Sequence, residues 1–163
     1  ESALDAYRNE YYYGKIPGAY SFAFVDLDDN NIPELIVGDG VSSILVYYYD
    51  GDKVVYGEAF PAEETKFYKG GYLIWSGGNM GSYYDNVYQY KDNMLSQVFN
   101  GGYGIDYDGS GEARYVVDGK MVSELVYYAE LGKYTQSGRL NYESYQYIED
   151  AYQAYCSSMN INN

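Results

Sequence analysis

The sequence predicts an α+β protein in which β structure dominates: an antiparallel meander of hairpins with an N-terminal and a C-terminal helix. Three observations support this fold class. Aromatic and β-branched runs of strand length recur along the chain, separated by turns that contain Asp and Gly. Apolar residues recur every three or four positions near both ends. Tyrosine occurs 26 times, and this residue suits strands that are wet on one side.

Both chain ends show the spacing of an amphipathic helix. Near the start this spacing predicts a helix over residues 1–13. Near the end it predicts a helix over residues 142–157, with Asn141 as its N-cap. The apolar positions that set the spacing are Leu4, Tyr7 and Tyr11 in the first helix and Tyr145, Ile148, Tyr152 and Tyr155 in the second.

Strands are predicted between the two helices. Residues 19–25 alternate aromatic with small side chains, which is the period of a pleated strand, and a second strand starts at residue 35. Four later segments have the layout of a hairpin, in which a short polar turn separates two apolar runs. These segments are residues 44–56, 67–75, 88–95 and 115–122.

Three segments are harder to assign from local pattern. The composition of residues 76–82 and 100–104, rich in Gly, predicts loops. Residues 122–129 fit a helix face, but the hairpin signal before them favours a strand, and we expect a strand there.

Length and charge bound the classes of function. The length of 163 residues predicts one domain, residues 1–163. The 24 acidic and 10 basic residues give a net charge of −14, which argues against nucleic acid and anionic membranes as partners. No apolar run approaches the length of a membrane span. No signal peptide is visible, but the chain starts at Glu1 and not at Met, so this absence carries little information.

The residue types present narrow the chemistry further. Histidine is absent, which removes the commonest general base and excludes Ser-His and Cys-His nucleophile pairs. Cys156 is the single cysteine, so no internal disulfide can form and an inert thiol is expected. A lone thiol is compatible with a bacterial surface protein.

An acidic stretch, residues 26–34, lies between the first two predicted strands and is the strongest chemical signal in the sequence. Oxygen donors occupy alternate positions, which point inward as a tight loop curls. Calcium takes roughly six to eight oxygen ligands, so the stretch predicts a structural Ca²⁺ site in which Ile32 contributes its backbone carbonyl. The predicted ligands are Asp26, Asp28, Asn30, Ile32 and Glu34.

The motif is not an EF-hand, because an EF-hand requires Glu at its twelfth position and a helix on each side. The twelfth position here is Val37, and both flanks are predicted strands. The run Asp-x-Asp-x-Asn-Asn-x-Pro-Glu-Leu-Ile-Val, residues 26–37, instead resembles the Asp-x-Asp-x-Asp-Gly-x-x-Asp/Glu-Leu calcium loop of FG-GAP and VCBS-type repeats.

Such repeats occur in integrin-α-like β-propellers and in many secreted bacterial proteins. Together with the Tyr-Asp-Gly-Asp-Lys hairpin at residues 49–53, the region also looks like uncharacterised secreted lipoproteins of gut Firmicutes. The resemblance is specific over about fifteen residues and implies a calcium-binding bacterial protein that is extracellular or anchored to the cell envelope.

The resemblance has two limits. Asn31 stands where the repeats usually have Gly, but Asn tolerates positive φ better than most residues, so the turn is still expected to form. A single loop cannot build a propeller, so the propeller fold is not implied for this chain.

Two weaker candidate sites follow in the sequence. Residues 106–112 are a possible second metal loop, but Arg114 has the wrong charge for the ninth position, and a solvated turn is the alternative. The oxygen-bearing residues there are Asp106, Asp108, Ser110 and Glu112. An aromatic platform for a sugar or peptide is the other candidate, with packing within the fold as its alternative. Its residues are Tyr72, Trp75, Tyr83 and Tyr84.

Two classes of function remain open. The first is a non-enzymatic, calcium-stabilised extracellular module that binds an unknown protein or glycan partner. The second is a secreted glycan hydrolase, which needs two carboxyl groups roughly 5–10 Å apart. The sequence gives no reason to pair any two of its candidate carboxylates, which include Glu58, Glu63, Glu64, Glu124 and Glu130. The missing histidine and the lack of a nucleophile motif favour the first class.

Overall fold

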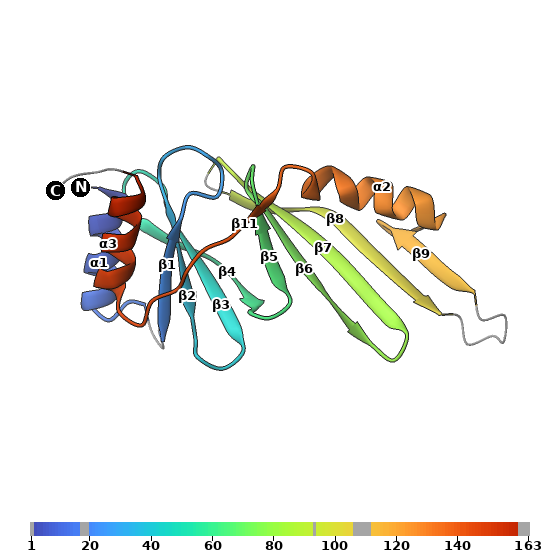
Figure 1. The fold of residues 1–163 in the computed structure, drawn as a ribbon, viewed down its shortest axis with the longest axis horizontal. Helices are drawn as coiled ribbons and strands as arrows, with labels where there is room; N and C mark the ends of the chain where they lie inside the picture. Colours follow the sequence, from blue (N-terminus) through green and yellow to red (C-terminus); the bar gives the residue numbers. More distant parts are fainter. Residues whose placement is uncertain (1, 17–19, 93, 106–111, 160–163) are drawn as a thin grey trace.

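The structure is a computed structural model that describes residues 2–16, 20–92, 94–105 and 112–159. Three helices and eleven strands lie within these ranges (Figure 1). In chain order they are α1 Ala3–Tyr12, β1 Ser21–Val25, β2 Glu34–Gly38, β3 Ser43–Tyr49, β4 Val54–Pro61, β5 Thr65–Tyr68, β6 Tyr72–Asn79, β7 Ser82–Lys91, β8 Met94–Ile105, β9 Ala113–Val117, β10 Lys120–Val122, α2 Glu124–Thr135, β11 Arg139–Leu140 and α3 Ile148–Ser158.

The strands form two sheets, and neighbouring strands pair antiparallel throughout. The smaller sheet has the order β1-β2-β3-β4, and the larger has the order β10-β9-β8-β7-β6-β5-β11. Most neighbours in the sheets are also neighbours in the chain. The predicted β-dominant α+β class and the meander of hairpins are therefore confirmed.

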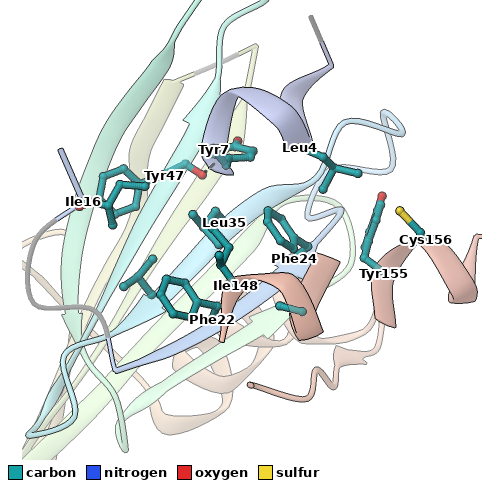
Figure 2. Close-up of a cluster of buried hydrophobic side chains, with 12 residues drawn as sticks. Leu4, Tyr7, Ile16, Phe22, Phe24, Leu35, Tyr47, Ile148, Tyr155 and Cys156 are labelled. Atoms are coloured by element: carbon teal, nitrogen blue, oxygen red, sulfur yellow. Dashed lines mark hydrogen bonds between the residues drawn. The ribbon is translucent and has the colours of Figure 1, made fainter. Parts of the chain in front are cut away.

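Helices α1 and α3 cover one face of the smaller sheet, side by side, so the first and the last helix of the chain lie together (Figure 1). Phe22 and Phe24 of β1 point toward them, and Tyr7 of α1 is fully buried in the same cluster (Figure 2). Arg8 ties the two helices together through an ion pair of 2.9 Å with Glu149.

The opposite face of the smaller sheet packs on the larger sheet. The intervening residues of β1, Ala23 and Val25, lie in this second cluster with Phe67 of β5 and Leu73 of β6. Because β1 and β2 are covered on both faces, their residues are buried almost without interruption. The loop that joins these two strands lies at the edge of this double-sided core.

A helix stands where a strand was predicted for residues 122–129, so that prediction is wrong. Strand β10 ends at Val122, and the side chain of Ser123 then accepts a hydrogen bond from the backbone N–H of Val126, which caps α2. Helix α2 packs on the larger sheet through Tyr127, which is fully buried. Gly101 of β8 leaves the necessary space, since a Cβ atom there would lie 2.7 Å from the Tyr127 hydroxyl oxygen.

Tyr127 also makes a polar contact beneath the helix, since its hydroxyl donates to Asp85 Oδ2 at 2.7 Å. Asp85 accepts a second hydrogen bond from the Ser76 hydroxyl. We expect Tyr127→Phe to lower the free energy of unfolding by about 1–2 kcal/mol, because the half-buried Asp85 carboxylate loses one donor. Urea unfolding followed by circular dichroism measures this loss. Tyr13→Phe is the control, since Tyr13 is 77% exposed, and an equal loss in both variants would contradict the role of the contact.

Three other segments differ from prediction. Residues 76–82 and 100–104 belong largely to β6, β7 and β8 and are not loops. The C-terminal helix begins at Ile148 after Tyr147, not after Asn141. The segment before it is extended because Tyr145 exchanges two backbone hydrogen bonds of 2.8 Å with Phe22 and so covers the outer edge of β1.

Among the described residues, none of the helices combines the length and apolar character that crossing a membrane requires.

Candidate metal centre

The acidic loop connects β1 to β2, as predicted, and its backbone turns sharply twice. Asp29 and Asn31 have positive φ values of 60° and 65°. Asn is among the few non-glycine residues that adopt this conformation readily, which explains how Asn31 occupies this position. The hydrogen bonds of Asp26 hold the loop in shape. Its Oδ1 accepts from the Asn30 amide at 3.0 Å, and its Oδ2 accepts from the Asn31 amide at 2.9 Å.

Three carboxylates converge inside this loop. One oxygen from each of Asp26, Asp28 and Glu34 lies within 4.8 Å of the others. Calcium–oxygen distances are about 2.3–2.6 Å, so two oxygens on opposite sides of one ion stand at most about 5 Å apart. The observed separation therefore suits a single ion without rearrangement of the loop. The donors are all oxygens, which fits a hard cation such as Ca²⁺ and not one that prefers nitrogen or sulfur.

Glu34 is the buried member of the group, with 1% of its surface exposed. Its Oε2 accepts a hydrogen bond of 2.9 Å from the Leu27 amide. Burial, followed by repulsion from Asp28 and Asp26, raises the pKa of Glu34 to about 8 despite that bond. Burial and the nearby Asp26 raise the pKa of Asp28 in the same way. Without a cation, ionising Asp28 and Glu34 together is therefore unfavourable.

Two buried side-chain oxygens in the described part of the chain have no hydrogen-bond partner there, and both belong to this region. One is Oδ1 of Asp28, a member of the three-carboxylate cluster. The other is the hydroxyl of Tyr155 on α3, a residue that is 9% exposed. Burial and then the charges of Asp26 and Glu34 raise the pKa of Tyr155 to about 12, so the hydroxyl lies within electrostatic reach of the group. Buried polar atoms normally have partners, so these two oxygens are exceptions among the described residues.

The second sheet also reaches the loop. Gly71, between β5 and β6, donates its amide to the Leu27 carbonyl at 2.6 Å and accepts from the Tyr90 amide at 2.7 Å. Tyr90 is 2% exposed, and burial raises the pKa of its phenol, with further contributions from the charges of Glu34 and Asp28 and from a hydrogen bond with Glu34. The loop is thus held by hydrogen bonds to the larger sheet as well as by its own two strands.

Two predicted ligands lie outside the converging carboxylates. Asn30 is exposed, and its Oδ1 accepts a hydrogen bond of 2.6 Å from the Ile32 amide. Ile32 is 38% exposed. Their part in coordination stays a prediction. Conversely, sequence reasoning placed Tyr155 on a helix and Tyr90 on a strand without linking either to the loop, since no local signal joins residues so far apart in the chain.

The other candidate sites are placed as follows. The possible second loop falls mainly on residues 106–111, which lie outside the described residues. Of the four platform residues, Trp75 and Tyr84 lie together, with ring centres 5.4 Å apart. Tyr72 and Tyr83 belong to the opposite face of the larger sheet, where they pack against Tyr134 and Tyr103. The structure therefore divides the four aromatic residues between two surfaces.

Three of the glutamates considered for hydrolysis have structural contacts. Glu64 accepts from Trp75 Nε1 at 2.9 Å and from the Tyr84 hydroxyl at 3.0 Å. Glu130 forms an ion pair with Lys133 one turn along α2. Glu124 hydrogen-bonds with Tyr115. Burial of Tyr115, and secondly this hydrogen bond, raise the pKa of its phenol. None of these contacts joins two carboxylates across a cleft.

Comparison of the chain with protein-family models, with curated proteins and with solved structures found no match.

Proposed function

We propose that this protein is a non-enzymatic extracellular or cell-envelope module whose fold depends on one Ca²⁺ ion at the acidic loop. The observations that support the proposal are the convergence of Asp26, Asp28 and Glu34 and the buried, unpartnered Asp28 Oδ1. A divalent cation would remove the repulsion among the carboxylates and supply the missing partner. The role is structural, since the loop joins β1 to β2 and contacts both sheets.

The proposed location follows from the same site. Calcium sites of extracellular modules bind with dissociation constants of about 10⁻⁴–10⁻³ M, which a short loop of this kind can provide. The resemblance of residues 26–37 to calcium loops of secreted bacterial proteins agrees with this location. Its partner is a protein or a glycan, which the module would present on a calcium-stabilised surface.

Thermal unfolding with calcium and with chelator tests the metal site. At a calcium concentration of roughly 100 times Kd, binding stabilises the folded state by about 2.7 kcal/mol, which raises Tm by about 5–10 °C for a chain of this size. We expect Asp28→Asn to weaken calcium affinity at least tenfold, because one charged ligand is lost. Magnesium at equal concentration should give a smaller shift, since it requires a tighter octahedral site.

Asp29→Asn is the matched control, since it removes the same charge from the adjacent, exposed residue and keeps a side chain that tolerates positive φ. It should retain most of the calcium response. A Tm that does not depend on calcium in the unmodified protein, or an equal loss of affinity in both variants, would overturn the proposed site.

A further inference from the structure

The chain between β11 and α3 crosses from the larger sheet to the smaller one (Figure 1). Its start belongs to the larger sheet, since Arg139 and Leu140 pair with β5. Near its end Tyr145 pairs with Phe22 of β1 in the smaller sheet. We call residues 141–144, which lie between these two attachments, the crossing segment.

Three cavities border the crossing segment, with volumes of about 270, 290 and 360 Å³, and Tyr142 lines all three. The first and second share Ala62, and the second and third share Asn141, so the three are neighbours. Each lies near the lower end of the range of small-molecule sites, which is roughly 300–1,000 Å³. A row of small cavities suits an extended ligand made of small units better than one compact molecule.

Tyr142 offers a ring and a hydroxyl at the centre of this row. Its ring packs against Phe67 of β5, with ring centres 5.7 Å apart, and the residue is still 39% exposed. Burial raises the pKa of the phenol, although Arg139 lowers it, so the hydroxyl is protonated at neutral pH. Within the described part of the chain this hydroxyl forms no hydrogen bond. A fixed ring that can pack on C–H groups, next to a free hydroxyl, is suited to a sugar.

The cavity of about 270 Å³ combines hydroxyl groups with buried apolar residues. The apolar residues are Ile36 and Ile44, which belong to the core between the sheets. The serines whose hydroxyls form no hydrogen bond with another described residue are Ser21, Ser42 and Ser144. Ser21 lies on the same face of β1 as Ala23, which is the face toward the larger sheet, and Gly38 leaves room for its hydroxyl because a Cβ atom there would meet it. This cavity can therefore bind the hydroxyls of a ligand.

The charges that line the three cavities favour a neutral ligand. Four acidic residues line them and two basic ones, and the whole chain carries −14. These residues are Asp26, Asp39, Glu63, Glu143, Lys66 and Arg139. An anionic polymer would be repelled, whereas a neutral polyhydroxy chain would not.

Strand edges near the crossing segment are largely covered, which argues against an extended peptide. A peptide that adds to a sheet gains its affinity from the free main-chain groups of an edge strand. Here Tyr145 covers β1, and β11 covers β5. The open edge that remains belongs to β11, which has two residues. Side-chain hydroxyls and one ring are the groups on offer, and these are the groups that recognise a glycan.

We propose that the row of cavities around Tyr142 binds a neutral glycan chain, with the Tyr142 ring packed on one sugar residue and the serine hydroxyls bonded to the next. This inference rests on the proposed function in that it names the partner of the module as a glycan. It requires no bond between the glycan and the calcium ion, so the two proposals can be tested separately.

The experiment is affinity electrophoresis in native gels that contain calcium and one soluble polysaccharide each. The neutral polysaccharides are mixed-linkage β-glucan, xyloglucan, arabinoxylan, galactomannan and glycogen, and polygalacturonate is the charged comparison. We expect at least one neutral polysaccharide to retard the protein. Tyr142→Ala should raise the dissociation constant at least tenfold, because the stacking ring is lost. Tyr147→Ala is the matched control, since it removes a ring that is 62% exposed and outside the three cavities, and it should bind normally.

A second pair of variants tests the cavity that holds the serines. Ser144→Trp should also raise the dissociation constant at least tenfold, because a large side chain would fill this cavity. Gln146→Trp adds the same side chain at an exposed position outside the cavities and should bind normally. If Tyr142→Ala does not fold, this second pair decides whether the cavities are the site.

The outcomes separate the two proposals. If Tm rises with calcium but no neutral polysaccharide retards the protein, the glycan site is wrong and the metal site stands. If retardation depends on Tyr142 while Tm ignores calcium, the metal site is wrong and the glycan site stands. Retardation that survives both Tyr142→Ala and Ser144→Trp, or that is strongest with polygalacturonate, would overturn the inference. So would a peptide array that binds through Tyr142 when none of the polysaccharides does, since the partner would then be a peptide.

Discussion

Replacing Glu34 with Gln is expected to stabilise the calcium-free protein at pH 8 by several kcal/mol and to remove most of its response to calcium. Glu34 is buried, and its pKa is raised from 4.5 to about 8. Gln has a similar shape, remains neutral at every pH and keeps an oxygen that can accept from the Leu27 amide. The variant therefore avoids the cost of burying a charge, but it loses the charged ligand that a calcium ion requires.

The pH dependence of the unmodified protein follows from the same shift. Below pH 4.5 Glu34 is protonated in both the folded and the unfolded state, and the buried neutral carboxyl carries no charge penalty. Between pH 4.5 and about 8 the unfolded chain releases this proton while the folded chain retains it, so stability falls as pH rises. One pKa unit corresponds to about 1.4 kcal/mol, so the loss across this window is on the order of 4 kcal/mol. Calcium should abolish the fall, because it stabilises the ionised form.

Chemical denaturation from pH 5 to pH 8, in calcium-depleted and in calcium-containing buffer, measures both effects. Glu63→Gln changes the same charge at an exposed position and should leave the slope with pH and the calcium response intact. The raised pKa of Asp28 should leave a weaker slope of the same sign in Glu34→Gln. If the stability of the calcium-free protein is flat across this range, Glu34 does not carry the raised pKa. If Glu34→Gln still gains stability from calcium, Glu34 is not a calcium ligand.

The acidic loop could be predicted because its information is local. Four carboxylates within nine residues, followed by strand-forming Leu35-Ile36-Val37, define a loop between strands whatever the rest of the fold does. Turn chemistry also explains the tolerance of Asn31 for its positive φ of 65°. The hairpins are predictable for the same reason, since Asp118 and Gly119 both adopt positive φ in the tight turn between β9 and β10.

Helix α2 was missed because the apolar stripe that faces the sheet, Tyr127, Leu131 and Tyr134, extends beyond residues 122–129 and does not include Leu125 or Val126. Leu125 is 81% exposed and Val126 is 44% exposed, although these are the residues that suggest a helix face in the sequence. The residue that anchors the helix is Tyr127, which meets Phe99 and the space beside Gly101 on β8. The hairpin signal at residues 115–122 favours a strand, whereas the packing of this stripe on the larger sheet decides the structure of the segment.

The glycine-rich strands and the partners of the metal loop fail prediction for a related reason. Gly77 lies within β6, and the residue there is glycine because a Cβ atom would meet Glu64 Oε2 at 2.6 Å and the Tyr84 hydroxyl at 2.5 Å. Glycine is required both where a sheet face is crowded and where the chain turns. Composition alone does not distinguish the two cases, so a glycine-rich strand is predicted as a loop. Tyr90 and Tyr155 approach the loop from distant segments, and only the fold brings them together.

Gly71→Ala is expected to lower the free energy of unfolding by about 3–4 kcal/mol, although the substitution adds a single methyl group and removes no side chain. Gly71 has a φ of +79°, where an L residue costs about 1–2 kcal/mol. An added Cβ atom would also lie 2.1 Å from the carbonyl oxygen of Tyr90, and backbone atoms cannot yield as a flexible side chain can. Moving apart would break the hydrogen bond of 2.6 Å from Gly71 to the Leu27 carbonyl, which joins the larger sheet to the metal loop.

Gly70→Ala is the matched control for this position. Gly70 has a φ of +85°, and a Cβ atom there would approach only the Tyr72 ring, at 3.4 Å. It should cost about 1–2 kcal/mol from the backbone conformation alone, so the excess loss in Gly71→Ala measures the clash and the broken link between the sheets. Because that link ends at Leu27, whose amide donates to Glu34, Gly71→Ala should also weaken calcium binding while Gly70→Ala does not. Equal losses in the two variants would mean that the larger sheet does not hold the loop, and the calcium ion would then stabilise the smaller sheet alone.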